Sequence, residues 1–249
     1  MIDAYTHCGL SKYLPVEDVL ATMEKSGVSN AVLCQHLGEY DNQYLARVVE
    51  LYPEKFTAVC LVDPESPEAR ADLRKWNSSG YFRGLRVLST TLSSNQSLCL
   101  EALDLGMNLM VYAPDGISDA VTPLLNITRQ QSKSRIIISH LGNPILTNGH
   151  LTGGQEIFQL ASEPGILVQL SGLSMFCDYP YTPLTKFIQE TIRQFTAARI
   201  LWGSNSPVCG NECAYIQDLN MILSRAWKLD PMQVEWITAR TAKETWFDT

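Results

Sequence analysis

Short apolar runs alternate with longer stretches in which apolar residues recur every three or four positions, along the whole chain. The short runs have the length and pattern of buried strands, and the longer stretches have the period of amphipathic helices. After the first run, for example, Val16, Val19, Leu20 and Met23 share one helix face, as do Leu45, Val48 and Val49 after the second. Strands are therefore predicted at residues 2–7, 30–35, 57–63, 82–88, 109–112, 135–140, 166–171 and 200–203.

Eight strands, each followed by a helical pattern, predict an α/β protein with a (β/α)8 TIM barrel. The 249 residues are a typical length for one such barrel. No linker, charge block or low-complexity tract divides the sequence, so a single domain over residues 1–249 is expected. In a barrel of this kind the active site lies at the carboxyl ends of the strands, so polar residues there are the candidates for chemistry.

Composition excludes some kinds of partner. With 45% hydrophobic and 18% charged residues the chain can bury a sizeable core, and its net charge of −7 argues against nucleic acid or an anionic membrane as a partner. The first residues do not resemble a signal peptide, and no apolar run approaches membrane-spanning length, so a cytoplasmic protein is expected. Whether the chain forms a homo-oligomer is left open.

Three of the four histidines fall at or just beyond predicted strand ends. His140 has the strongest signal because it closes the buried run 136–138, whereas His36 is better explained as a loop residue and His150 as an exposed turn residue. A single histidine is as often structural as functional, but three at one rim favour a site. The other polar side chains expected at or near this rim are Tyr5, Arg86, Tyr112, Ser171 and Asn205.

Arg86 is predicted to point into the barrel, on the same strand face as Gly84 and Leu88. A guanidinium in that position needs an anionic partner. Its forked donors suit a substrate carboxylate, but an internal ion pair with Asp63 or Asp3 is almost equally compatible with the sequence. Both alternatives remain open at this stage.

Several short motifs occur in an order that resembles a known family. The motifs are IDAYTH (2–7), YDNQYL (40–45), YPEKF (52–56), GLR (84–86), HLGNP (140–144), LSGL (170–173) and LWGSNSP (201–207). Together they are similar to the amidohydrolase-related branch of the amidohydrolase superfamily, with lactonases as the nearest subgroup and carboxymuconate semialdehyde decarboxylases as more distant relatives.

The resemblance assigns roles to individual residues. His7 and His140 match two histidines of the family, while Tyr5 stands where the family has its first strand-one histidine and Asn205 where it has a strand-eight aspartate that serves as general base. The resemblance thus implies a catalytic group of His7, His140 and Asn205. Tyr5, His36, Arg86, Tyr112 and Ser171 are the candidates for substrate contacts, because of their places at or near the predicted strand ends.

The two substitutions bear on metal binding. An amide neither deprotonates water nor supplies the anionic oxygen that a divalent ion prefers, and a tyrosine beside a single histidine is a poor ligand pair. We therefore expect no cofactor and no tightly bound metal; a zinc ion, if bound at all, would use His7 and His140. The expected function is hydrolysis of a lactone, ester or amide bond in a small, anionic, carboxylated molecule. A decarboxylase or isomerase, and a catalytically silent barrel that binds a ligand or a protein, are the alternatives.

Overall fold

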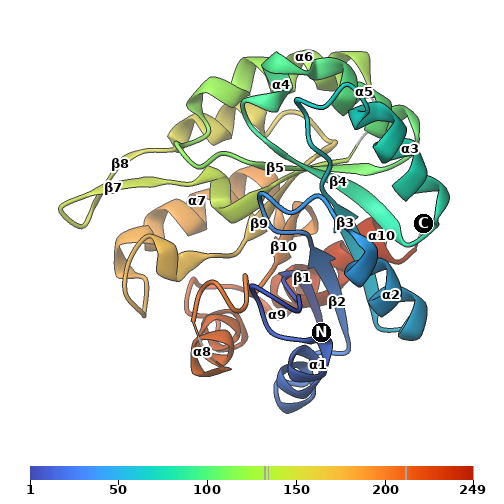
Figure 1. Cartoon of the computed structure of the whole chain (residues 1–249). Helices are drawn as coiled ribbons and strands as arrows, with labels where there is room; N and C mark the ends of the chain where they lie inside the picture. Colours follow the sequence, from blue (N-terminus) through green and yellow to red (C-terminus); the bar gives the residue numbers. More distant parts are fainter. Residues whose placement is uncertain (132, 134, 211, 249) are drawn as a thin grey trace.

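The computed structural model describes residues 1–131, 133, 135–210 and 212–248, and its centre is one sheet of eight parallel strands. Neighbouring strands pair in chain order, except that β6 pairs directly with β9 (Figure 1). All eight predicted strands are present, which confirms the α/β class and the TIM barrel. The strands are β1 (Ile2–Thr6), β2 (Asn30–Cys34), β3 (Phe56–Cys60), β4 (Phe82–Leu88), β5 (Asn108–Tyr112), β6 (Ile136–Ile138), β9 (Ile166–Leu170) and β10 (Ile200–Trp202).

The barrel closes where the chain segment after β10 meets β1. Main-chain hydrogen bonds run from Asn205 N to the Tyr5 oxygen (2.8 Å) and from His7 N to the Ser206 oxygen (2.8 Å). The carboxylate of Asp3 accepts bonds from Ser204 N (2.9 Å) and Ser204 Oγ (2.6 Å). A side chain at Gly203 would place its Cβ 2.6 Å from that of Tyr5, so only glycine allows this close approach.

Helices surround the sheet, and their buried faces follow the sequence pattern (Figure 1). Val16, Val19 and Met23 of α1 are buried, as are Leu45 and Val48 of α2. No helix in the described part of the chain is long and apolar enough to cross a membrane. The helices are α1 (Val16–Lys25), α2 (Gln43–Leu51), α3 (Ala69–Ser78), α4 (Thr91–Ser94), α5 (Gln96–Asp104), α6 (Val121–Gln130), α7 (Thr185–Phe195), α8 (Glu212–Leu223), α9 (Pro231–Glu235) and α10 (Thr241–Trp246).

The segment between β6 and β9 departs from the expected strand–helix alternation. In place of an α-helix it forms the hairpin β7 (Ile145–Thr147) and β8 (His150–Gly153), which Figure 1 shows reaching away from the barrel, followed by a 3-10 helix (Gln155–Leu160). Asn148 and Gly149 both have positive φ (51° and 75°), the conformation of a tight hairpin turn. His150 is exposed on β8, directly after that turn.

The interior of the barrel is filled by apolar side chains, and this limits where a ligand can bind. A compact cluster takes Val32 from β2, Val59 from β3, Met110 from β5, Ile137 from β6 and Leu167 from β9, all buried. Such a packed core is typical of TIM barrels. Polar side chains are gathered above it, at the carboxyl ends of the strands.

Candidate active site

His7 lies just beyond β1 and is 2% exposed. Its Nδ1 is 2.6 Å from the main-chain oxygen of Cys34. A carbonyl oxygen can only accept, so the neutral ring carries its proton on Nδ1 and presents Nε2 as a free acceptor. Tyr13 stacks on the ring with centroids 4.9 Å apart. The pKa of His7 is lowered to about 3, first by burial and then by the positive charge of Arg86.

His140 lies two residues beyond β6, in a short turn where its φ is 52°. Its Nδ1 is 2.9 Å from Ser171 Oγ at the end of β9. A Cβ on Gly172 would lie 2.7 Å from the same nitrogen, so the glycine leaves room for the ring. The pKa of His140 is also lowered to about 3, first by burial and then by the charge of Arg86. Both histidines are therefore neutral in the empty site.

Tyr5 lies between the two histidines and below the pocket. Its ring centroid is 5.1 Å from that of His7 and 4.8 Å from that of His140, both edge-on. The hydroxyl is buried without a hydrogen-bond partner among the described residues. Burial raises the pKa of Tyr5 well above its usual value, so the side chain stays a neutral phenol.

Arg86 points into the same region from β4 and is 5% exposed. One guanidinium nitrogen, Nη1, donates to the main-chain oxygen of Gln35 (2.7 Å), while Nε has no partner among the described residues. Asp3 is bonded to Ser204, and Asp63 accepts from Glu65 N (3.0 Å) within its own loop. Of the two partners considered from the sequence, neither aspartate pairs with Arg86 in this structure.

A pocket of about 170 Å³ opens above these residues. Of the eight predicted site residues, five line it: His7, Arg86, Tyr112, His140 and Asn205. Tyr5 and Ser171 lie behind the lining, and His36 lines a neighbouring pocket. The barrel thus brings the two histidines, Arg86 and Asn205 together, from four different strand ends.

Sequence reasoning missed five side chains of the pocket. They come from loops that follow strands: Lys12 and Tyr13 after β1, Leu37 after β2, Met175 after β9 and Val208 after β10. The strand-end rule considers only residues next to a strand, so loops that fold back over the barrel escape it. Lys12 lies 5.5 Å from the centre of the Tyr13 ring and adds a second positive charge to the pocket, whose described lining contains no acidic residue.

Asn205 has a positive φ of 52°, and its amide nitrogen lies 3.3 Å from Met175 Sδ and 3.2 Å from Cys209 Sγ. These sulfur atoms are weak partners, and the amide does not titrate. Asn205 therefore borders the pocket without supplying a base.

The side chains that would face a metal ion at this position do not suit one. In the described part of the chain, no three His, Cys, Asp or Glu side chains gather as a metal site would require. His7 and His140 would be two nitrogen ligands, but Tyr5 remains a phenol and Arg86 places a cation beside them. Two histidines with no anionic ligand and a nearby guanidinium fit a tightly bound divalent ion poorly.

Comparison with protein families decides the relationship that the motifs suggested. The family model described as Amidohydrolase matches residues 5–247, nearly the whole chain. The chain belongs to the amidohydrolase family.

This amidohydrolase is similar to one curated protein and to many solved structures. It is 27% identical to an L-fucono-1,5-lactonase from Burkholderia ambifaria over 202 residues, which is 77% of this chain and 69% of the relative. A candidate 2-pyrone-4,6-dicarboxylic acid hydrolase from Pseudomonas putida has a TM-score of 0.78 at 18% identity and covers 98% of this chain and 96% of its own. A zinc-bound amidohydrolase from Burkholderia multivorans has a TM-score of 0.76 at 14% identity, covering 98% of both chains. At these identities the solved structures establish the shared fold alone.

Proposed function

We propose that this amidohydrolase hydrolyses a lactone, ester or amide bond in a small carboxylated molecule, without a tightly bound metal. The observation that carries the proposal is Arg86, a buried guanidinium at the pocket whose Nε has no partner and which pairs with no carboxylate among the described residues. A buried charge without a counterion is costly, and a substrate carboxylate would supply the missing partner. The likeness to a lactonase supports hydrolysis of a cyclic ester in particular.

His140 supplies the proton transfers. When Nδ1 of His140 donates to Ser171 Oγ, its Nε2 can accept a proton from water as the water oxygen attacks the carbonyl carbon. The same proton then passes to the ring oxygen as the carbon–oxygen bond breaks, which yields a hydroxy acid. A substrate anion beside Arg86 also offsets part of the positive charge that lowers the pKa of His140, so the bound substrate makes the base stronger.

The tautomer of His7 decides what this side chain can do in the reaction. Because its proton lies toward the Cys34 oxygen, the neutral ring presents an acceptor and does not donate to the substrate carbonyl. The donors that line the pocket include Arg86 and the hydroxyl of Tyr112, whose ring centre lies 5.5 Å from the guanidinium carbon. We assign carbonyl polarisation to these donors and orientation of the water to His7.

Two measurements test this function. Proton release from a panel of carboxylated lactones at constant pH should reveal hydrolysis, whereas release of carbon dioxide from aromatic acids without lactone opening would support the decarboxylase alternative, which the amide at Asn205 favours. Hydrolysis should be lost with His140→Asn and retained with His150→Asn, a matched change at an exposed position. A folded protein that binds these acids and turns over none of them would support a silent binding barrel.

Metal content is tested separately. We expect the purified protein to hold well under one equivalent of zinc or another divalent ion, because Tyr5 and Asn205 remove two of the family's ligands. Elemental analysis after dialysis against a chelator provides the measurement. One ion per chain that resists the chelator would overturn the metal-free proposal.

A further inference from the structure

A second cavity, of about 120 Å³, opens on the other side of Arg86. Arg86 and Leu37 line both this cavity and the histidine pocket, so the two spaces adjoin at the guanidinium. The remaining wall comes mainly from the ends of β3 and β4 and from α5. It is built largely of apolar side chains: Leu61, Val62, Pro64, Val87, Leu88 and Leu98.

The size and lining of this cavity limit what it can hold. An apolar protein cavity of roughly 150 Å³ remains dry and accepts a benzene ring. The space beside Arg86 is somewhat smaller, so it suits a branched alkyl group of about four carbons. Hydroxyl groups would lose their hydrogen bonds to water there and find few partners in return.

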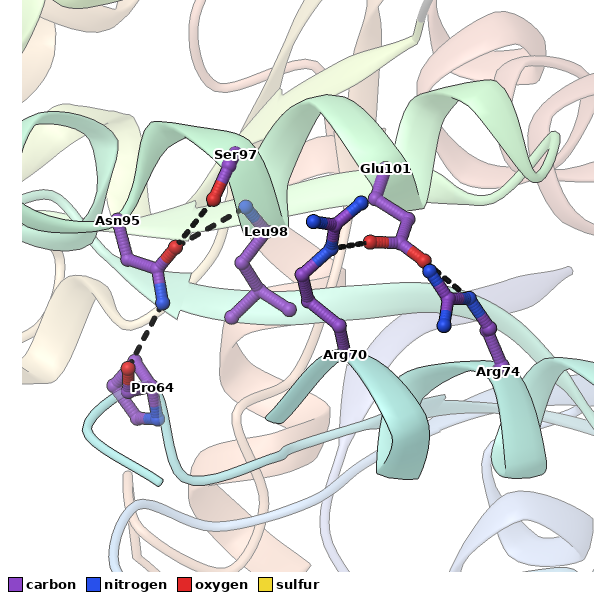
Figure 2. Close-up of polar contacts among 7 residues, drawn as sticks. All are labelled: Pro64, Arg70, Arg74, Asn95, Ser97, Leu98 and Glu101. Carbon is purple, nitrogen blue, oxygen red and sulfur yellow. Dashed lines mark hydrogen bonds and ion pairs between the residues drawn. The ribbon is translucent and has the colours of Figure 1, made fainter. Parts of the chain in front are cut away.

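The cavity wall is held in place by Asn95, at the start of α5 (Figure 2). Its Nδ2 donates to the main-chain oxygen of Pro64 (2.9 Å), and its Oδ1 accepts from Leu98 N (3.3 Å). Both partners of Asn95, Pro64 and Leu98, line the cavity. One side chain therefore ties the loop after β3 to the first turn of α5.

An ionic contact joins α5 to α3 one turn further along α5. Glu101 of α5, whose side chain is 9% exposed, accepts from Arg70 and from Arg74 of α3, the latter at 2.6 Å (Figure 2). With both carboxylate oxygens engaged, α3 and α5 are joined next to the cavity. The cavity is thus preformed, and a ligand does not have to order its walls.

We propose that this cavity is the substrate subsite for a branched alkyl group, so that the substrate is an alkyl-substituted carboxylated lactone. The proposal rests on the proposed function only in taking Arg86 as the carboxylate anchor. The acid group binds the guanidinium, the lactone lies in the histidine pocket, and the alkyl group extends past Leu37 into the cavity. Asn95 acts as a positioning residue because it holds two cavity residues together and touches no substrate.

Binding can be measured without any turnover. Calorimetry would compare cyclopentanecarboxylate with its 3-isobutyl derivative and with a 3-(2,3-dihydroxypropyl) derivative of similar length. Burial of about four carbons should make the isobutyl acid bind roughly 10- to 100-fold more tightly than the parent acid. The dihydroxypropyl acid should gain less than about threefold, because its hydroxyl groups would be buried with few partners. Equal affinity of the three acids would overturn the subsite.

Substitutions in the cavity test whether the higher affinity for the isobutyl acid arises there. Leu98→Phe fills the cavity and should abolish the preference for the isobutyl acid while leaving the affinity for the parent acid within about twofold. Leu100→Phe is the matched control, since Leu100 lies on the same helix but does not line the cavity. If Leu98→Phe does not fold, Leu88→Phe fills the same space from the partly exposed end of β4. An isobutyl preference that survives filling would also overturn the subsite.

Asn95→Asp tests the positioning role. The carboxylate still accepts from Leu98 N but no longer donates to Pro64, so the isobutyl preference should fall several-fold while the affinity for the parent acid is kept. Failure of the subsite and failure of the proposed function are distinguishable. If the isobutyl acid binds tightly but no lactone is opened, the subsite holds and hydrolysis is wrong; if lactones are opened with no alkyl preference, the reverse is true.

Discussion

Asp3 and Arg86 are both charged side chains buried in the barrel, but their surroundings differ. Asp3, 0% exposed, accepts bonds from Tyr5 N (3.1 Å), Ser204 N (2.9 Å) and Ser204 Oγ (2.6 Å). Arg86 donates to the Gln35 oxygen and leaves its Nε unpaired. The protein satisfies one charge internally and leaves the other incompletely satisfied.

This difference separates a structural group from a binding group. The partners of Asp3 belong to the segments that close the barrel, and burial raises its pKa to about 6 although the bonds from Ser204 lower it. Arg86 borders two cavities and lies close enough to lower the pKa of His7 and of His140. Substitutions around Asp3 should therefore affect folding, and those around Arg86 should affect catalysis.

The largest effect should come from His140, on the catalytic side of the comparison. His140→Ala removes the proposed base, so kcat should fall by about 10²- to 10⁴-fold. His36→Ala is the control, because His36 lines a different pocket and should remain near wild type. Steady-state kinetics on a lactone that the protein opens would measure both. Full turnover by His140→Ala with loss in His36→Ala would mean that the wrong histidine was chosen.

Next in size is Arg86→Met, which tests the anion anchor. Loss of a charge-assisted contact should lower kcat/KM for a carboxylated substrate by roughly 10²- to 10³-fold. The Tm of the empty protein should stay within about 3 °C, because no ion pair to an aspartate is broken. A neutral lactone with the same ring is the matched substrate control and should lose much less. A variant with a much lower Tm and unchanged affinity for acids would show that Arg86, like Asp3, is a structural charge.

Asp3→Ala should have the opposite profile. Three hydrogen bonds at the barrel closure are lost and their donors are left buried, so the free energy of unfolding should fall by about 2–4 kcal/mol. Turnover per folded molecule should change little, since Asp3 does not line the pocket. Asp3→Asn keeps an acceptor and should cost less. Denaturant unfolding measures the stability, and a stable Asp3→Ala protein without activity would assign Asp3 to catalysis.

The smallest effect is that of pH, because we expect kcat/KM to stay constant in mildly acidic solution. Burial and the charge of Arg86 lower the pKa of His140 from 6.5 to about 3, so the imidazole remains unprotonated throughout mildly acidic solution. The acidic limb of kcat/KM should therefore be absent between pH 8 and pH 5, whereas an ordinary histidine base would lose activity below about pH 6.5. A limb with a pKa between 6 and 7 would contradict the buried, neutral state of His140.

The strands could be predicted because local patterns decide them. Runs such as Ile136 to Ile138 are apolar on both faces, which suits only a strand covered on both sides. The missing helix between β6 and β9 could have been read only from the turn residues, since Asn148 and Gly149 mark a hairpin. The regular alternation of strands and helices along the rest of the chain predicted a helix there despite these turn residues.

The sequence by itself determined the barrel, the strand ends that carry His7, Arg86, His140 and Asn205, and the family. Only the tertiary structure decided that neither Asp3 nor Asp63 pairs with Arg86 and that Tyr5 lies behind the pocket. It alone revealed the apolar cavity beside Arg86. The physical reason is the separation along the chain. Hydrophobic periodicity is a pattern among residues a few positions apart, whereas the partners of a buried charge and the walls of a cavity come from segments far apart in the chain.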